Sequence, residues 1–516
     1  MEPDHGGRRV FHRLSRLGEE VPNPEAGSAL RDTDRAHRGT VPAGADIRRA
    51  VGFAAAMDEL CDRTASELSR MLRAREVSAR EVLDAHLERI DRWNPVANAI
   101  VTRTTGLALE RAAGLDERLS RGEEPGLLHG VPIAHKDLVD TAGIRTTYGS
   151  PIFADNVPDE DEPFVSRLRD AGSVLVGKTN TPEFGAGSHT FNPVFGATRD
   201  PYDVSRSAGG SSGGAAAALA TGMVPIADGS DLGGSLRNPA SFCNVVGFRP
   251  TLTDEDPLDL STDGPMARTV PDVALLWSAM TGDPPLPTEG DVGGLRVAWA
   301  PACGGALPVE PVVAAVIDAA RPAFEALGCA TVDGYPDLAG AREAFFTLRA
   351  RSYATDLAEL LDAHRAQIKA TVVWNIEQGL ALGDEDVAHA VGRMHGVRTS
   401  AARFFTTQAD YLVQPVTQVP PFPIELEYPT EVAGEPMTTY LGWMASCWSI
   451  TVLGGPAISV PCGFTDDGLP IGLQIVGRRG DDAGVLRLAR AYEEATGVGR
   501  IRPVMDQGPD PRHPAG

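Results

Sequence analysis

Apolar side chains recur at intervals of three and four residues in the segment that follows Met57. The positions concerned are Leu60, Leu68, Met71 and Leu72, and then Val82, Leu83, Leu87 and Ile90. This spacing places the side chains on one face of a helix, so it predicts two amphipathic helices. Ser78 precedes the second helix and Glu81 follows three residues later, which is the pattern of a capping box at a helix start.

Between residues 130 and 250 the pattern changes to short, continuous apolar runs separated by helix-like segments and glycine turns. The runs are Val131–Ala134, Val174–Val176, Val224–Ala227 and Val245–Phe248. Alternation of this kind predicts an α/β fold in which helices cover a sheet.

The C-terminal half continues this alternation around a long helical region. Residues 340–410 look mainly helical, and a helix is also expected at Val312–Leu327. Strand-like runs occur at Leu295–Ala298, Tyr411–Val413, Ala457–Val460 and Leu473–Val476, and Leu486–Ala495 predicts a closing helix.

A single domain over residues 57–502 accounts for these elements. We expect its core at about 125–280 and 445–500, with a more peripheral α/β and helical region at about 290–440. Residues 1–56 are rich in Arg, Gly, Pro, Asp and Glu without sustained periodicity, which predicts a disordered extension. Residues 503–516 are rich in Pro and Asp and predict a flexible tail.

Composition limits the partners of this chain. It carries 47 basic and 70 acidic residues, a net charge of −23, which disfavours binding to a phosphate backbone. No apolar stretch approaches the ~18 residues of a membrane span. The six cysteines are scattered without a CxxC pair, which favours free buried thiols in a reducing compartment. We therefore expect a cytoplasmic protein without nucleic-acid or membrane partners.

Lysine is scarce: the chain has three lysines, Lys136, Lys178 and Lys369, against forty-four arginines. Arginine stays protonated at physiological pH, whereas a buried lysine can lose its proton and act as a base. The retained lysines are therefore candidates for roles that arginine cannot perform. Lys136 is the strongest, because it follows the apolar run Val131–Ala134 with one residue, His135, between.

A glycine- and serine-rich segment at Gly209–Gly214 is the first candidate for chemistry. Its sequence would also suit a linker, but Ala215–Ala220 continues it with good helix formers. A glycine turn that opens onto a helix presents backbone N–H groups to a ligand. The segment also fits the GxSxG pattern of a nucleophile elbow at Ser211, but the preceding residues 200–207 are polar rather than strand-like.

A second glycine-framed serine lies at Ser235, after the sequence Asp231-Leu-Gly-Gly. Adjacent glycines allow consecutive backbone N–H groups to point at one spot. Such a nest beside a serine hydroxyl supplies both a nucleophile and an oxyanion hole, as acyl transfer requires. Asp231 and Arg237 flank the nest with opposite charges and could clamp it, although a simple tight turn would have a similar sequence.

Two other patterns carry little weight. Gly172–Thr179 matches the P-loop pattern, but its middle residues, Ser-Val-Leu-Val, form a strand-like run where a phosphate loop needs an open turn. Lys178 is therefore expected to be structural, at a strand end. The sequence has no HExxH motif, no Cys/His cluster and no EF-hand loop, so we expect neither a metal nor another cofactor.

Taken together, these segments resemble the amidase signature family. The resemblance runs from Gly130–Asp137 through Gly177–Asn180 and Gly209–Gly214, and then through Asp231–Gly247. Weaker similarity extends to Gly455–Pro461, so that roughly residues 57–500 are covered. The resemblance implies a single α/β/α domain with a mixed twisted sheet, and usually no cofactor. The acidic segment 252–263 departs from the family pattern, in which this loop often contains glycine and basic residues.

The resemblance also assigns roles to individual residues. It implies Lys136 as the catalytic lysine, Ser211 as a bridging serine held by a cis Gly210–Ser211 peptide, and Ser235 as the acylated serine. The implied oxyanion donors are the N–H groups of Leu232, Gly233, Gly234 and Ser235. The implied substrate-binding positions are Gly185, Ala186, Ser188 and Gly210. The small residues at 185–188 suggest room for a bulky or aromatic acyl group.

The expected function is therefore hydrolysis of a carboxylic amide to an acid and ammonia or an amine. Ser235 would attack, and a buried, neutral Lys136 would take the proton through Ser211. The alternatives are a Ser-His-Asp esterase built on Ser211, a non-hydrolytic subunit resembling the amidotransferase that acts on misacylated tRNA, and a catalytically silent scaffold. The expected partner is a small-molecule amide, and a homodimer is left open.

Overall fold

The computed structural model of this protein describes residues 58–253 and 258–504. The predicted extension at 1–56 lies outside the described residues, as does all but the first two residues of the predicted tail. Most of the acidic segment at 252–263 is described, with residues 254–257 excepted.

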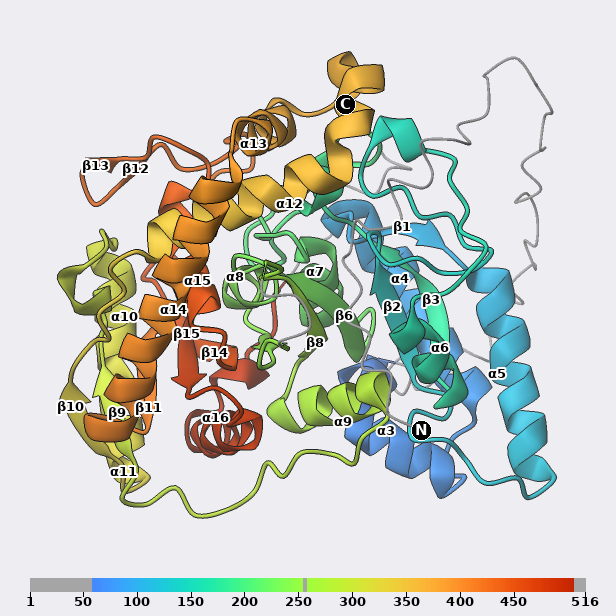
Figure 1. Ribbon diagram of the computed structural model, residues 1–516. Helices are drawn as coiled ribbons and strands as arrows, with labels where there is room; N and C mark the ends of the chain where they lie inside the picture. Colours follow the sequence, from blue (N-terminus) through green and yellow to red (C-terminus); the bar gives the residue numbers. More distant parts are fainter. Residues whose placement is uncertain (1–57, 254–257, 505–516) are drawn as a thin grey trace, which may run out of the picture.

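A mixed sheet of 11 strands runs through the described part of the chain (Figure 1). In spatial order its strands are β1 (Ile100–Arg103), β3 (Val174–Thr179), β2 (Pro132–Lys136), β6 (Ile226–Asp231), β8 (Thr262–Ala267), β7 (Val246–Arg249), β14 (Ala457–Phe464), β15 (Pro470–Gly477), β11 (Tyr411–Pro415), β9 (Arg296–Trp299) and β10 (Ala330–Asp333). β2 runs parallel to β3 and β6, and β9 runs parallel to β10 and β11, whereas the strands between these groups pair antiparallel. Two small hairpins, β4 (Phe191–Asn192) with β5 (Gly196–Ala197) and β12 (Glu431–Val432) with β13 (Glu435–Pro436), lie apart from it.

Every apolar run that predicted a strand lies on or overlaps a strand of this sheet. The runs are continuous rather than alternating because helices cover both faces, so that β2, β7 and β15 are buried along their whole length. The run Val174–Val176 belongs to β3, which extends through Lys178 to Thr179. A strand at this position confirms the strand-like interpretation of the segment that matches the P-loop pattern.

Fourteen α-helices surround the sheet in the described ranges. They are α3 (Ala65–Arg73), α4 (Ala79–Ala97), α5 (Thr105–Ser120), α6 (Pro163–Asp170), α7 (Gly213–Ala220), α8 (Arg237–Phe242), α9 (Val270–Thr281), α10 (Pro311–Ala319), α11 (Arg321–Ala326), α12 (Ala341–His364), α13 (Ala370–Leu380), α14 (Asp384–Thr407), α15 (Ala445–Leu453) and α16 (Asp482–Thr496). Figure 1 shows α12, α13, α14 and α15 gathered on one side of the molecule, away from α3 and α5.

Local sequence signals explain several helix boundaries. Ser78 and Glu81 form the predicted capping box at the start of α4. The single helix expected at 312–327 is instead two helices, α10 and α11, which is a correction to the prediction. Pro322 lies in the first turn of α11 and lacks the N–H that a continuous helix would need at that point, so the break falls just before it.

Helix α7 contacts β2, β3 and β6, and its eight residues are glycine, alanine and one leucine, all of them buried. Small side chains allow a helix to approach the sheet closely, which brings the turn before α7 next to the ends of β2 and β6. No helix of the described chain has the length and apolarity of a membrane span. All six cysteines of the chain lie in the described residues, buried and free, as predicted.

Candidate active site

Lys136 is the last residue of β2 and is completely buried. Its Nζ lies 2.7 Å from Ser211 Oγ and 3.0 Å from Ser230 Oγ, and its backbone N–H donates to Asp228 at 2.9 Å. Burial lowers the pKa of Lys136 to about 7, even though the acidic groups of Asp263 and two other aspartates act to raise it. A neutral amine is therefore well populated near pH 7.

Ser211 belongs to the turn that opens α7. The Gly210–Ser211 peptide bond is cis, as the resemblance implied, and Gly209 has a φ of 73°. The carbonyl oxygen of Gly210 accepts a hydrogen bond from Ser188 Oγ at 2.6 Å. A methyl group on Gly213 would collide with the Thr190 side chain, so the start of α7 has no room for a side chain. These contacts fix the turn against neighbouring segments.

The loop that carries Ser235 follows the end of β6 at Asp231. Gly234 has a φ of 118°, and its N–H donates to Asp231 Oδ1 at 2.7 Å. The carbonyl oxygen of Ser235 accepts from the N–H of Ser212 at 3.2 Å, which joins this loop to the turn that holds Ser211. The two glycine-framed serines of the sequence thus lie in adjacent, hydrogen-bonded loops.

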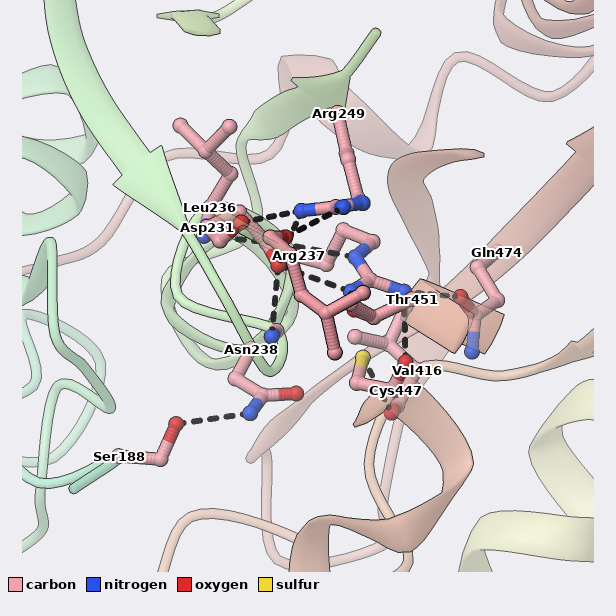
Figure 2. Close-up of polar contacts among 12 residues, drawn as sticks. Ser188, Asp231, Leu236, Arg237, Asn238, Arg249, Val416, Cys447, Thr451 and Gln474 are labelled. Carbon is pink, nitrogen blue, oxygen red and sulfur yellow. Dashed lines mark hydrogen bonds and ion pairs between the residues drawn. The ribbon is translucent and has the colours of Figure 1, made fainter. Parts of the chain in front are cut away.

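Figure 2 shows how Asp231 ties this loop to the rest of the sheet. Arg237, at the start of α8, donates to both carboxylate oxygens of Asp231 at 2.9 Å, and Arg249 lies within 3.4 Å of the same group. All three side chains are completely buried. Burial alone would raise the pKa of Asp231, but the Arg237 guanidinium, with help from Arg249, lowers it overall. The predicted clamp between Asp231 and Arg237 is confirmed.

Asn238 extends this network towards Ser211. Its Nδ2 donates to Ser188 Oγ at 2.7 Å, a contact drawn in Figure 2, and Ser188 in turn donates to Gly210. Ser188, a predicted substrate-binding position, therefore supports the cis turn from behind.

A small recess brings several of the candidate residues together. It is lined by Leu138, Phe184, Gly185, Gly187, Ser211, Ser230, Leu232, Gly233, Ser235, Ser261, Arg349, Tyr353 and Met444. Of the predicted positions, Lys136 lies behind Ser211 and Ser230, while Ala186, Ser188, Gly210 and Gly234 lie outside the lining.

Sequence reasoning did not identify Ser230, Arg349, Tyr353 or Met444 as wall residues of this recess. Ser230 could have been suspected, because it lies in the same Asp228–Ser235 segment as the glycine nest. Arg349 and Tyr353 lie on α12, more than 100 residues from the Ser235 loop, and no local motif marks them.

Two other buried basic side chains, on β3 and β2, have partners of their own. Lys178 Nζ donates to the carbonyl oxygen of Val139 and lies 3.0 Å from Thr141 Oγ1, which fits the structural role predicted for it. His135 contacts Asp228 through Nδ1. No histidine of the described residues lines the recess, and no group of three metal-ligating side chains is found within the described part of the chain.

Several known proteins are similar in sequence to this chain. A family model described as Amidase matches residues 81–486. An acylamidase of Rhodococcus erythropolis is 36% identical over 472 residues, which cover 86% of this chain and 97% of the relative. A glutamyl-tRNA(Gln) amidotransferase subunit of Geobacillus kaustophilus (strain HTA426) is also 36% identical, over 494 residues that cover 86% of this chain and 100% of the relative.

Two solved structures are similar to this chain in fold. A bacterial aryl acylamidase of the amidase signature family has a TM-score of 0.78 and 26% identity, covering 86% of this chain and 99% of that chain. The 6-aminohexanoate cyclic dimer hydrolase has a TM-score of 0.76 and 29% identity, with the same two coverages of 86% and 99%.

Proposed function

This chain belongs to the amidase signature family and is an amidase enzyme, and we propose that it hydrolyses a small carboxylic amide through an acyl-enzyme on Ser235. The observation that carries the proposal is the 2.7 Å contact between Lys136 Nζ and Ser211 Oγ at the wall of the recess that also exposes Ser235. A lysine with a pKa near 7 beside a serine is the arrangement needed for a base that works through a relay.

In the proposed reaction, Ser211 passes its hydroxyl proton to neutral Lys136 and receives the proton of Ser235. The Ser235 oxygen attacks the amide carbonyl carbon, and the carbonyl oxygen becomes the oxyanion of a tetrahedral intermediate. The C–N bond then breaks as the proton returns through Ser211 to the leaving nitrogen. Water, deprotonated along the same route, attacks the acyl-enzyme, and the acid leaves with Ser235 restored.

Backbone N–H groups of the loop 232–235 would hold the oxyanion. Those of Gly233 and Ser235 donate to no residue of the described chain, so they are available to a ligand. The N–H of Gly234 is already donated to Asp231, so its part is to fix the loop rather than to bind the oxyanion directly. A preorganised donor of this kind typically contributes about 10²–10³ in rate.

A second candidate function keeps the same chemistry but changes the acceptor of the ammonia. The amidotransferase subunit from Geobacillus kaustophilus is as similar to this chain as the acylamidase is, at 36% identity. The net charge of −23 disfavours work on a nucleic acid. Release of acid and amine by the isolated chain favours the hydrolase, whereas activity only with an added partner protein would favour the amidotransferase.

Labelling of the nucleophile tests the proposal. A fluorophosphonate should add once to the protein, as measured by intact mass, and the adduct should be absent from Ser235→Ala. Ser261→Ala, which alters another serine of the recess, serves as the matched control and should retain the adduct. An adduct that persists in Ser235→Ala and disappears in Ser211→Ala would favour the nucleophile-elbow alternative.

A further inference from the structure

A buried arginine faces the catalytic recess with most of its hydrogen-bonding capacity unused. Arg349, on α12, is 5% exposed and is one of the residues that line the recess. Its Nη2 donates to the hydroxyl groups of Tyr353, at 3.1 Å, and Tyr440, at 2.8 Å. Its guanidinium carbon also lies 4.5 Å from the centre of the Tyr353 ring, a contact that orients the group without neutralising its charge. Its Nε is buried without a hydrogen-bond partner, and its Nη1 donates to no described residue.

The other deeply buried cations of the described chain are compensated. Arg237 and Arg249 share the carboxylate of Asp231. Arg268 donates to four backbone carbonyl oxygens, and Lys178 donates to the carbonyl oxygen of Val139 and to the hydroxyl groups of Thr141 and Thr146. Arg349 forms no ion pair with any acidic side chain that the structure describes. An uncompensated buried guanidinium is costly, so such a group is expected to be retained for a ligand.

Helix α12 places Arg349 between the two catalytic loops. One turn earlier on the helix, Phe345 packs against the Ser235 loop, since a methyl group on Gly233 would lie 2.9 Å from Phe345 Cζ. One turn later, the hydroxyl of Tyr353 donates to the carbonyl oxygen of Phe184 at 3.3 Å. The neighbouring Gly185 adjoins Ser211, because a methyl group there would lie 3.6 Å from Ser211 Oγ.

We propose that Arg349 is an anion-binding subsite and that the substrate is an amide that carries a carboxylate. This inference rests on the proposed function, since it places the anion beside the amide bond that Ser235 attacks. The guanidinium presents a planar fork of N–H donors that matches a carboxylate. The protein as a whole is strongly acidic, so long-range attraction does not bring an anion to the recess, and recognition depends on this local cation.

The carboxylate can belong to either half of the amide, and two pairs of substrates separate the cases. N-(4-nitrophenyl)succinamic acid and its methyl ester differ in charge on the acyl side. 4-Acetamidobenzoate and its methyl ester differ in charge on the amine side. We expect kcat/KM of one acid to exceed that of its ester by about 10- to 100-fold, which is the usual range for a charge-assisted hydrogen bond.

Variants assign this preference to Arg349. Arg349→Met should reduce the acid-to-ester ratio to near one, and Arg349→Lys, which keeps the charge without the fork, should retain part of it. Arg351→Met is the matched control, because Arg351 is an exposed arginine two residues away on the same helix, and its ratio should equal that of the parent enzyme. Circular dichroism and unfolding midpoints establish that each variant is folded.

The outcomes distinguish the two proposals. Cleavage of both pairs with acid-to-ester ratios near one in the parent enzyme would overturn the subsite and leave the amidase mechanism intact. Failure to cleave any amide, with no fluorophosphonate adduct at Ser235, would overturn the proposed function. Succinate binding, measured by calorimetry in Ser235→Ala, tests the subsite without turnover: binding that Arg349→Met does not weaken, or no binding at all, also overturns it.

Discussion

Replacing Lys136 with methionine should abolish activity. The difference in stability between the variant and the parent should also favour the variant more near pH 7 than at high pH. Burial lowers the pKa of Lys136 from 10.5 to about 7. Between these values the unfolded chain binds a proton that the folded protein does not. Below pH 7 the parent protein therefore carries the whole destabilisation caused by burying a charged lysine. It recovers stability as the pH rises through this window, and above about pH 10.5 this destabilisation is gone.

The size of this pH-dependent difference in stability follows from the one proton that the unfolded chain binds. Each pH unit within the window changes the free energy of unfolding by about 1.4 kcal/mol, so the advantage of Lys136→Met should be larger at pH 7 than at pH 9.5 by about 3 kcal/mol. The variant also loses the contacts of Nζ with Ser211 and Ser230. That loss shifts the stability of the variant by a nearly constant amount, so the dependence on pH reports the ionisation of Lys136 together with that of the coupled Asp263, whose pKa burial raises to about 8.

Urea unfolding of the parent and the variant, followed by circular dichroism at several pH values from 7 to 9.5, measures this difference. Ser211→Ala is the control, because it removes a contact of Nζ but keeps the titrating amine, and its stability should run nearly parallel to that of the parent. The parent's kcat/KM should rise with pH along a limb centred near 7. A stability difference between parent and Lys136→Met that stays constant with pH would refute a neutral Lys136 and with it the proposed base.

Four further results are expected. Asp263→Asn should move the acidic limb of kcat/KM to lower pH, because the Asp263 carboxylate raises the pKa of Lys136; an unchanged limb would show that the two groups are uncoupled. Asp231→Asn should cost about 3–5 kcal/mol in urea unfolding, since two buried guanidinium groups lose their carboxylate; a loss below about 1 kcal/mol would contradict this. Gly247→Ala should destabilise by about 1–3 kcal/mol, because the new methyl group would collide with the backbone oxygen of Leu236, whereas Gly392→Ala meets nothing within 4 Å and should be neutral or slightly stabilising. Exhaustive dialysis against EDTA should leave activity intact, and a loss restored by one divalent ion would refute the metal-free mechanism.

Much of the fold was predictable because its signals are local. Continuous apolar runs marked the buried strands, and Ser78 with Glu81 marked the start of α4. Strand β8 was not predicted, since Thr262–Ala267 contains Gly264 and Pro265 and lacks the apolar character of its neighbours. It forms a strand because it pairs along its whole length with β6, which only the assembled sheet provides.

The sequence by itself identified the candidate groups at the ends of β2 and β6: a rare lysine, two glycine-framed serines, and an aspartate with an arginine beside it. Each of these features is short, because close backbone approach and clustered N–H groups depend on adjacent residues. The tertiary structure alone decided what surrounds them. The register of β6 and β8 sets Asp263 opposite Ser230, and the packing of α12 brings Arg349 to the recess. The local sequence predicts that an isolated arginine in a helix is solvent-exposed. Its burial depends on contacts with segments far away in the chain, which a local pattern does not contain.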